Sequence, residues 1–339
     1  MENASISVLR AFGLKCTGTA KHKAGFTCRT TNGAYSLLRV PFAPDCIRFR
    51  HSVKEHLYNE GFTGISRLLV SDTGEPFTVY DNEAYIVTRH LPHREARLSD
   101  SAEFLRVIQA AARMHALCRG KQHGPMPVPP RPAQEVYRIH ADALSTCKRR
   151  ILKKGKYAEL DILFLRSFDA YMADLANWRD LAETQAYAAQ LQTAFDGFYV
   201  CHGLLKEENI LISPAGTVTF RNFAECGYGH TIIDLAALIK RYIKAAPPDL
   251  LPLEQVLSAY AAECPLDDGA RLFLHAELLF PDKYLKLCAK YYDRNRTWTP
   301  GAFISRMEAI LQNREACLAY ISGGRMGKIV GMCKGTVNN

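Results

Sequence analysis

Two hydrophobic patterns divide the chain into a first part rich in short strands and a longer helical part. In the first part, apolar and β-branched residues form short runs separated by turn residues, which is typical of antiparallel strands. These runs are 26–30, 33–40, 76–80 and 85–88, with turn residues at 32–33 and 73–74. The pattern therefore predicts a small β-rich lobe over residues 1–90, with an antiparallel sheet and one helix.

The rest of the chain has the spacing of amphipathic helices. The predicted helices are 99–119, nearly everything from 134 to 198, 232–245, 253–264, 268–291 and 301–321. A proline-rich stretch, 125–132, is expected to be a loop. The order predicts an α+β, two-lobed chain with a helical C-lobe over 91–322. The glycine-rich basic tail, 323–339, lacks periodicity and is predicted to be disordered.

Composition and charge exclude several classes of protein. Of the 339 residues 48% are hydrophobic, and the net charge is +9. The 11 cysteines stand singly without any C-x-x-C pair, which argues against zinc and against a disulfide scaffold. His90 and His93 are interpreted as polar residues beside a hinge rather than metal ligands. No stretch predicts a signal peptide or a membrane span, so we expect cytoplasmic synthesis and no membrane partner.

A basic cluster in the helical part, 148–156, is the strongest local concentration of charge. Such clusters can attract nucleic acid or other polyanions, but most are solvated helix faces. No nucleic-acid motif accompanies the cluster and aromatic residues do not alternate with it. A nucleic-acid partner is therefore not expected, and polyanion binding through this helix stays an alternative.

The stretch from His202 to Asn209 carries the most specific chemical signal in the chain. Kinase-type catalytic loops place an aspartate two residues after a histidine, and an asparagine five residues after that aspartate. Asn209 stands at the asparagine position, where the side chain holds magnesium, but Leu204 occupies the position of the aspartate. Leucine can neither accept a proton nor bind a metal. The stretch therefore resembles a phosphotransferase loop that has lost its general base.

The residues after this loop strengthen the comparison. Two β-prone runs, 210–212 and 217–220, flank the turn residues 213–216 and predict a hairpin. In kinase-like folds such a hairpin leads to a second metal-binding aspartate, and Asn222 stands at that position. Asparagine offers only a neutral oxygen, whereas magnesium prefers a charged one. A metal site built from Asn209 and Asn222 is therefore expected to be weak.

With these motifs, the chain resembles the bacterial spore-coat CotS family, within the aminoglycoside/choline phosphotransferase superfamily of protein-kinase-like fold. Other segments similar to this family, in order along the chain, are 8–14, 49–62, 84–88, 94–95, 111–115 and 281–292. The resemblance covers residues 5–321 and implies a small N-lobe and a larger helical C-lobe around a nucleotide cleft. It also implies synthesis in the mother cell, a place in the spore coat, and coat proteins as partners.

The resemblance assigns roles to residues of the cleft. A working member carries a third-strand lysine that pairs the nucleotide phosphates with a helix glutamate. Leu38 stands at the lysine position, and Arg39 should point away from the cleft because adjacent strand side chains face opposite ways, unless the register shifts by one residue. Glu55 is the candidate helix glutamate. The backbone from Thr88 to Leu91 is the candidate adenine-binding hinge.

Two further residues are expected to have structural roles. His202 can anchor the catalytic loop by hydrogen bonding to backbone. Asp234 lies in the first turn of a predicted helix, where a carboxylate interacts favourably with the helix dipole. The resemblance implies that this aspartate braces the catalytic loop.

Three departures, Leu38, Leu204 and Asn222, fall on the charged groups that phosphoryl transfer uses. Loss of a general base alone lowers the rate by about 10²–10⁴. The sequence therefore predicts a kinase-fold protein without catalysis, acting as a binding or scaffold component of the spore coat. Such a cleft can still hold ATP weakly through hinge backbone, with magnesium contributing little. The alternative is an active small-molecule phosphotransferase in which Glu207 or Glu208 replaces the lost base.

Overall fold

The computed structural model describes residues 2–22, 25–126, 128–245, 249–292 and 299–322. They form two compact units, each assembled from separate segments of the chain. The described residues of the first fall within Met1–Arg97, Ala110–Pro127 and Gly197–Tyr228. The described residues of the second fall within Leu98–Gln109, Val128–Asp196 and Gly229–Asn339. Each predicted lobe is one continuous stretch of sequence, whereas each observed unit combines segments that are separated in the sequence. The predicted tail, 323–339, lies outside the described residues.

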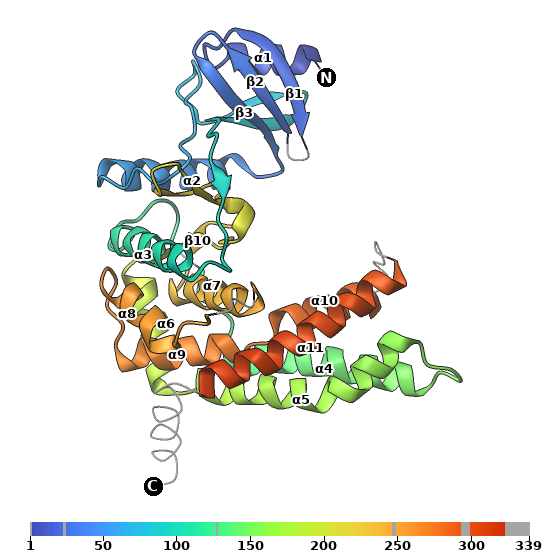
Figure 1. Ribbon diagram of the computed structural model, residues 1–339. Coiled ribbons are helices and arrows are strands. Elements are labelled where there is room, and N and C mark those ends of the chain that lie inside the picture. The colour runs from blue at the N-terminus through green and yellow to red at the C-terminus, as the bar shows by residue number, and fades with distance from the viewer. Residues whose placement is uncertain (1, 23–24, 127, 246–248, 293–298, 323–339) are drawn as a thin grey trace. The chain divides into compact units, whose positions relative to one another are not determined.

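A five-stranded antiparallel sheet forms the centre of the first unit, with strand order β1-β2-β3-β5-β4 (Figure 1). Its strands are β1 (Cys16–His22), β2 (Gly25–Thr30), β3 (Gly33–Val40), β4 (Thr78–Tyr80) and β5 (Glu83–Arg89). The four predicted runs correspond to β2–β5, so the periodicity prediction is confirmed. Gly33 begins β3 with a φ of 114°, a backbone angle that suits glycine at the predicted turn.

The two faces of this sheet are covered by different helices. Helix α1 (Glu2–Arg10) places Val8 and Leu9 in a core with Leu37 of β3. On the other face, Ile47 of α2 (Pro44–Asn59) packs in a cluster that Val40 borders. The prediction of one helix in residues 1–90 is wrong, because both α1 and α2 lie there. Helix α1 is too short to show a clear helical periodicity, and its packing against the core stabilises it.

The first unit also contains the segment around the predicted catalytic loop. Strand β7 (Val200–Cys201) pairs with β10 (Gly227–Tyr228), and the 3₁₀ turn η1 (Glu207–Asn209) forms the end of the loop. Strands β6 (Arg94–Glu95), β8 (Ile210–Ile212) and β9 (Val218–Phe220) form a three-stranded sheet. The hairpin between β8 and β9 closes through a bond from the Gly216 amide to the Ser213 carbonyl at 2.9 Å, as the turn residues predict.

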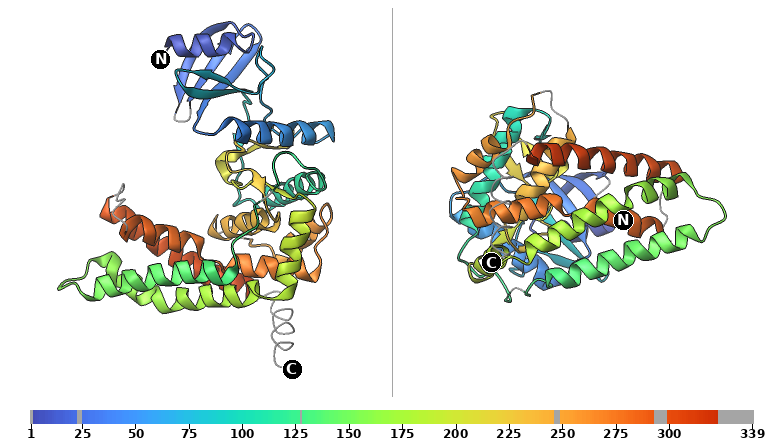
Figure 2. Two further views of the ribbon diagram at one scale, coloured as in Figure 1. Left: turned by 180° about the vertical axis from the view of Figure 1, so that it is seen from behind. Right: turned by 90° about the horizontal axis from the view of Figure 1, so that it is seen from below.

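Helices make up the second unit. They are α4 (Ala133–Leu152), α5 (Glu159–Ala182), α6 (Gln185–Asp196), α7 (Ile232–Ala245), α8 (Leu253–Ala261), α9 (Asp268–Leu279), α10 (Asp282–Tyr292) and α11 (Pro300–Ser322). Helix α3 (Ser101–Leu117) contributes residues to both units. Helices α4, α5, α10 and α11 lie side by side in both views of Figure 2 and share one hydrophobic cluster.

The prediction of a single helix over 268–291 is wrong. Phe280 has a ψ of 120° and ends α9, and α10 begins at Asp282. Pro281 explains the break, because proline lacks an amide proton and disfavours helical backbone in the residue before it. The break leaves the Phe280 carbonyl without a helical partner, and the side chain of Lys240 donates to it at 2.8 Å.

Candidate functional site

His202 fixes the start of the catalytic-loop segment through bonds to backbone on both ring nitrogens. The Leu204 amide donates to Nδ1 at 3.2 Å, so Nε2 carries the ring proton and donates to the Arg221 carbonyl at 3.1 Å. The side chain is buried and its ring centroid lies 4.4 Å from that of Phe223. His202 thus ties the loop to the segment that follows β9, as a neutral imidazole in a defined tautomer.

Gly203 allows the chain to turn beside Glu225. Its φ is +74°, and a Cβ placed there would lie 2.4 Å from the Glu225 carbonyl oxygen. We expect Gly203→Ala to lower the free energy of unfolding by about 3 kcal/mol, measured by urea denaturation. Gly216→Ala is the matched control: its φ is +82° but no atom lies within 4 Å, so it should cost only about 1–2 kcal/mol. Equal costs would contradict the close contact at Gly203.

The two asparagines at the predicted metal positions are hydrogen-bonded to each other. Asn209 Nδ2 donates to the Leu204 carbonyl at 2.9 Å, which turns Asn209 Oδ1 towards Asn222. Asn222 Nδ2 then donates to that oxygen at 3.2 Å. Asn222 has a φ of 58°, a left-handed conformation that asparagine tolerates better than most residues. The oxygen that would bind magnesium therefore already accepts one hydrogen bond, and the amide group beside it is a donor, which disfavours a cation.

Strand β3 directs Leu38 and Arg39 to opposite faces of the sheet. Leu38 lies opposite Ile86 and lines a cavity of about 460 Å³ in the first unit. Arg39 also borders this cavity, but its guanidinium pairs with Glu83 at 2.5 Å and its side chain is 65% exposed. The predicted lysine position therefore carries an apolar side chain, and Arg39, paired with Glu83, does not supply a charge in its place.

Of the four basic residues that line the cavity, two come from helix α2. Lys54 and Arg50 lie one turn apart and both line the cavity. Lys54 is 4% exposed, and its Nζ donates to the Ser66 carbonyl at 2.7 Å and lies 4.8 Å from the Phe223 ring centroid. The Arg50 guanidinium stacks on Phe42 at 3.9 Å, and its Nε is buried without a hydrogen-bond partner among the described residues. Burial lowers the pKa of Lys54 to about 8.

Lys54 and Arg50 were not among the predicted cleft residues, although the spacing of buried residues in α2 contains the signal. Ile47 and Leu57 are buried, and Lys54 follows Ile47 by seven residues and precedes Leu57 by three. Helical periodicity places position 54 on the buried stripe with them. The predicted helix glutamate, Glu55, instead pairs with Arg67 through two hydrogen bonds, one of them 2.9 Å from Arg67 Nε to Glu55 Oε1. Glu55 does not line the cavity.

The remaining predicted site residues are divided between the two units. Thr88 is buried and lines the cavity, whereas Leu91 does not line it. Asp234 lies in the second unit, buried in the first turn of α7. Its role in bracing the catalytic loop stays a prediction.

The charges that line the cleft favour an anion over a metal. Of the described residues that line it, only Glu208 carries a carboxylate, and Lys206 lies 2.5 Å from that carboxylate. No group of three or more His, Cys, Asp or Glu in the described part of the chain is arranged to hold a metal ion. The cleft therefore offers Lys54 and Arg50 for a phosphate but no carboxylate pair for magnesium.

Comparison with models of protein families identifies one family that matches nearly the whole chain. The family model described as "Spore coat putative kinase YutH" matches residues 6–322. The chain belongs to this family. The match spans nearly the range over which the sequence resembles spore-coat proteins of the kinase-like superfamily, so that resemblance is confirmed. A search of curated proteins gave no match.

Solved structures similar to this spore-coat family member are phosphotransferases. An aminoglycoside phosphotransferase from Alicyclobacillus acidocaldarius has a TM-score of 0.81 at 16% identity, covering 97% of this chain and 96% of that one. The spectinomycin phosphotransferase APH(9)-Ia has a TM-score of 0.61 at 11% identity, covering 91% and 92%. Choline kinase from Cryptosporidium parvum has a TM-score of 0.55 at 10% identity, covering 95% of this chain and 92% of that one. These likenesses confirm the predicted α+β kinase-like fold.

Three further sequence predictions concern membrane spans, cysteines and the basic cluster. No helix among the residues described is long and apolar enough to cross a membrane. All ten described cysteines are free, and eight of them are buried. In the basic cluster, Lys148 pairs with Asp169 at 3.2 Å and Lys154 pairs with the buried Asp161 at 2.6 Å. These ion pairs favour the interpretation of 148–156 as a solvated helix face.

Proposed function

We propose that this spore-coat family member is a catalytically inactive kinase-fold protein that serves as a binding or scaffold component in coat assembly. The hydrogen bond between Asn209 and Asn222 carries the proposal, because it engages the oxygen on which a magnesium site would depend and places an amide donor beside it. Leu204 supplies no base to the same loop, and Leu38 supplies no cation from β3. Coat proteins are the proposed partners, and the mother-cell cytoplasm is the proposed place of synthesis.

The cleft of this protein binds a nucleotide or a similar phosphate-bearing ligand without metal. Lys54 and Arg50 provide positive charge from one face of α2, and the Arg50 Nε is a buried donor with no partner among the described residues. A guanidinium and an ammonium in a partly buried cavity both form charge-assisted bonds to phosphate oxygens. Binding of this kind needs neither Leu204 nor a metal ion, and it does not lead to transfer.

Titration calorimetry with ATP tests this proposal. We expect ATP to bind with the same affinity, within about twofold, in magnesium and in EDTA, and ADP not to accumulate over hours at 37 °C. Magnesium that tightens binding tenfold would contradict the occupied metal position. Turnover at an ordinary kinase rate, about 1–100 per second, would contradict inactivity.

A second candidate, an active phosphotransferase with a shifted base, is favoured by one observation. Glu208 is the single carboxylate among the described residues that line the cleft. Its side chain is 56% exposed and lies against Lys206, so it would have to turn inward to accept a proton. Measurable turnover that Glu208→Gln abolishes, and that Glu207→Gln leaves intact, would identify this candidate as the correct one.

A further inference from the structure

A second cavity, of about 340 Å³, lies within the second unit between α5, α7, α10 and α11. Its volume is in the range of sites that take small organic molecules. No residue that lines it belongs to the first unit, which contains the catalytic-loop segment. We call it the basic cavity, because seven of its lining residues are lysine or arginine and only two are aspartate.

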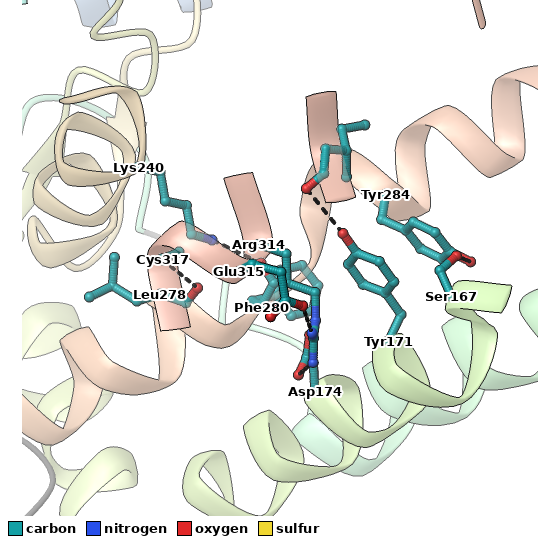
Figure 3. Close-up of polar contacts among 11 residues, drawn as sticks. Ser167, Tyr171, Asp174, Lys240, Leu278, Phe280, Tyr284, Arg314, Glu315 and Cys317 are labelled. Atoms are coloured by element: carbon teal, nitrogen blue, oxygen red, sulfur yellow. Dashed lines mark hydrogen bonds and ion pairs between the residues drawn. The ribbon is translucent and has the colours of Figure 1, made fainter. Parts of the chain in front are cut away.

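The wall formed by α5 and α11 is held rigidly by polar contacts (Figure 3). Arg314 binds the carboxylate of Asp174 through two bonds, from Nε at 2.5 Å and from Nη2 at 2.8 Å. The Tyr171 hydroxyl donates to the Ile310 carbonyl at 3.3 Å, and its ring stacks on Tyr284 with centroids 3.7 Å apart. A site whose walls are fixed before a ligand arrives loses less entropy on binding.

Little negative charge is left to balance the basic residues. Asp174 is occupied by Arg314, and Asp282 lies 3.6 Å from Lys286. Lys244 and Lys283 form no ion pair with any residue that the structure describes. Burial lowers the pKa of Lys283, and the nearby Arg241, Lys244 and Lys240 lower it further, against the opposing effect of Asp282. The cations therefore repel one another, and a bound anion would relieve that repulsion.

The rest of the lining is suited to an apolar body. Leu278, Leu287 and Leu318 contribute aliphatic surface, and Phe280 contributes a ring. Asn313 also lines the cavity, and its buried Oδ1 has no hydrogen-bond partner among the described residues. Buried acceptors are rarely left unpaired, so this oxygen is available to a donor on a ligand.

We propose that the basic cavity binds a small amphipathic anion, an apolar body that carries a carboxylate or a phosphate. Its charged group would lie against Lys244 and Lys283, and its apolar body against the leucines and the Tyr171–Tyr284 stack. Apolar walls with a few convergent charges are the usual composition of a small-molecule site. This binding site does not depend on nucleotide in the cleft.

Fluorescence titration with a matched pair of probes tests the proposal. 8-Anilinonaphthalene-1-sulfonate carries an anionic group on an apolar body, and N-phenyl-1-naphthylamine is the same body without the charge. We expect the anionic probe to bind at least tenfold more tightly than the neutral one. Equal binding of the two probes, or no binding of the anionic one to the folded protein, would overturn the proposal.

Two variants locate the bound probe. The double change Lys244→Gln/Lys283→Gln should weaken binding of the anionic probe at least tenfold. The control Lys153→Gln/Lys156→Gln removes the same charge from exposed positions that do not line the cavity, and should leave the affinity within about twofold. Ala309→Trp fills the cavity without changing charge and should weaken both probes. Circular dichroism checks folding, and if the double variant is unfolded, Ala309→Trp decides the outcome.

Competition distinguishes the two chemical sources of the anionic group. Displacement of the probe by octanoate indicates a carboxylate ligand, and stronger displacement by octyl phosphate indicates a phosphate ligand. Octanol is the uncharged control of the same chain length. If neither anion displaces the probe better than octanol, or if both double variants weaken it equally, the cavity does not select an anion and the proposal is wrong.

Discussion

Replacing Leu204 and Asn222 by aspartate should make nucleotide binding depend on magnesium. The change at position 222 removes the amide donor that occupies Asn209 Oδ1, and supplies a charged oxygen beside it. We expect the double variant to bind ATP at least tenfold more tightly in magnesium than in EDTA, about 1.4 kcal/mol. The unchanged protein should show no such difference. Titration calorimetry in the two buffers measures both affinities.

Leu204→Asn with Asn222 unchanged is the matched control for that experiment. It introduces a polar side chain of similar size without the charge, so magnesium should stay without effect. If the folded aspartate variant remains indifferent to magnesium, position 222 is not a metal position and the assignment of this loop is wrong. If the control gains a magnesium dependence, polarity at position 204 is sufficient and the Asn209–Asn222 bond does not limit metal binding.

The structure changes how a complete reversion should be designed. A lysine at position 38 would enter a cavity that already contains Lys54 and Arg50, and like charges in a partly buried site repel. The reversion therefore combines Leu38→Lys with Lys54→Glu, since position 54, and not Glu55, is the inward position of α2. The new pair would place a helix glutamate opposite a strand lysine, as in an active kinase.

The sequence predicted the fold well where periodicity and turn chemistry agree. Strand runs such as 33–40, and the hairpin closed by Ser213 and Gly216, follow from local pattern alone. The break at Pro281 could also be predicted from the sequence, because proline disfavours helical backbone in the residue before it. The interleaving of the two units could not be predicted, because it depends on contacts between segments far apart in the chain.

The cleft was predictable residue by residue only where a motif sets the spacing. Asn209 and Asn222, which both line the cavity, were predicted from the fixed lengths of the loop and hairpin, whereas Leu204, predicted in the same way, does not line it. Lys54 was missed because a buried lysine contradicts the usual distribution of charge. The direction of the Asn209 amide could not be inferred either, since it is set by a bond to a backbone carbonyl. The motif therefore predicts which residues stand at the metal positions, but the hydrogen bonds of their side chains determine whether those residues can bind a metal ion.

Lys54→Met should stabilise the protein and weaken its binding of ATP. Burial lowers the pKa of Lys54 from 10.5 to about 8, so the charged form is disfavoured in the folded state. This charge burial lowers the free energy of unfolding by about 3 kcal/mol at pH 7. The substitution removes that cost, but it also removes the hydrogen bond to the Ser66 carbonyl, which stabilises the folded state by about 1 kcal/mol. We expect a net gain of about 2 kcal/mol in the free energy of unfolding, measured by urea denaturation. ATP affinity should fall tenfold or more, because hydrogen bonds to charged groups contribute about 1.5–3 kcal/mol.

The dependence on pH separates this charge effect from a simple change in packing. In the unfolded chain Lys54 keeps its ordinary pKa of 10.5, so between pH 8 and 10.5 the unfolded state binds more protons than the folded state. The destabilisation by Lys54 is therefore fully present below pH 8 and declines as the pH rises towards 10.5. The stability gain of Lys54→Met should shrink between pH 8 and 10.5, and the ATP affinity of the unchanged protein should fall as the pH rises above 8.

The control is Lys15→Met, at an exposed position, which should change the free energy of unfolding by less than about 0.5 kcal/mol throughout this pH range. A stability gain in Lys54→Met that does not vary with pH would show that methionine only packs better, and that Lys54 is not a strained cation kept for an anionic ligand.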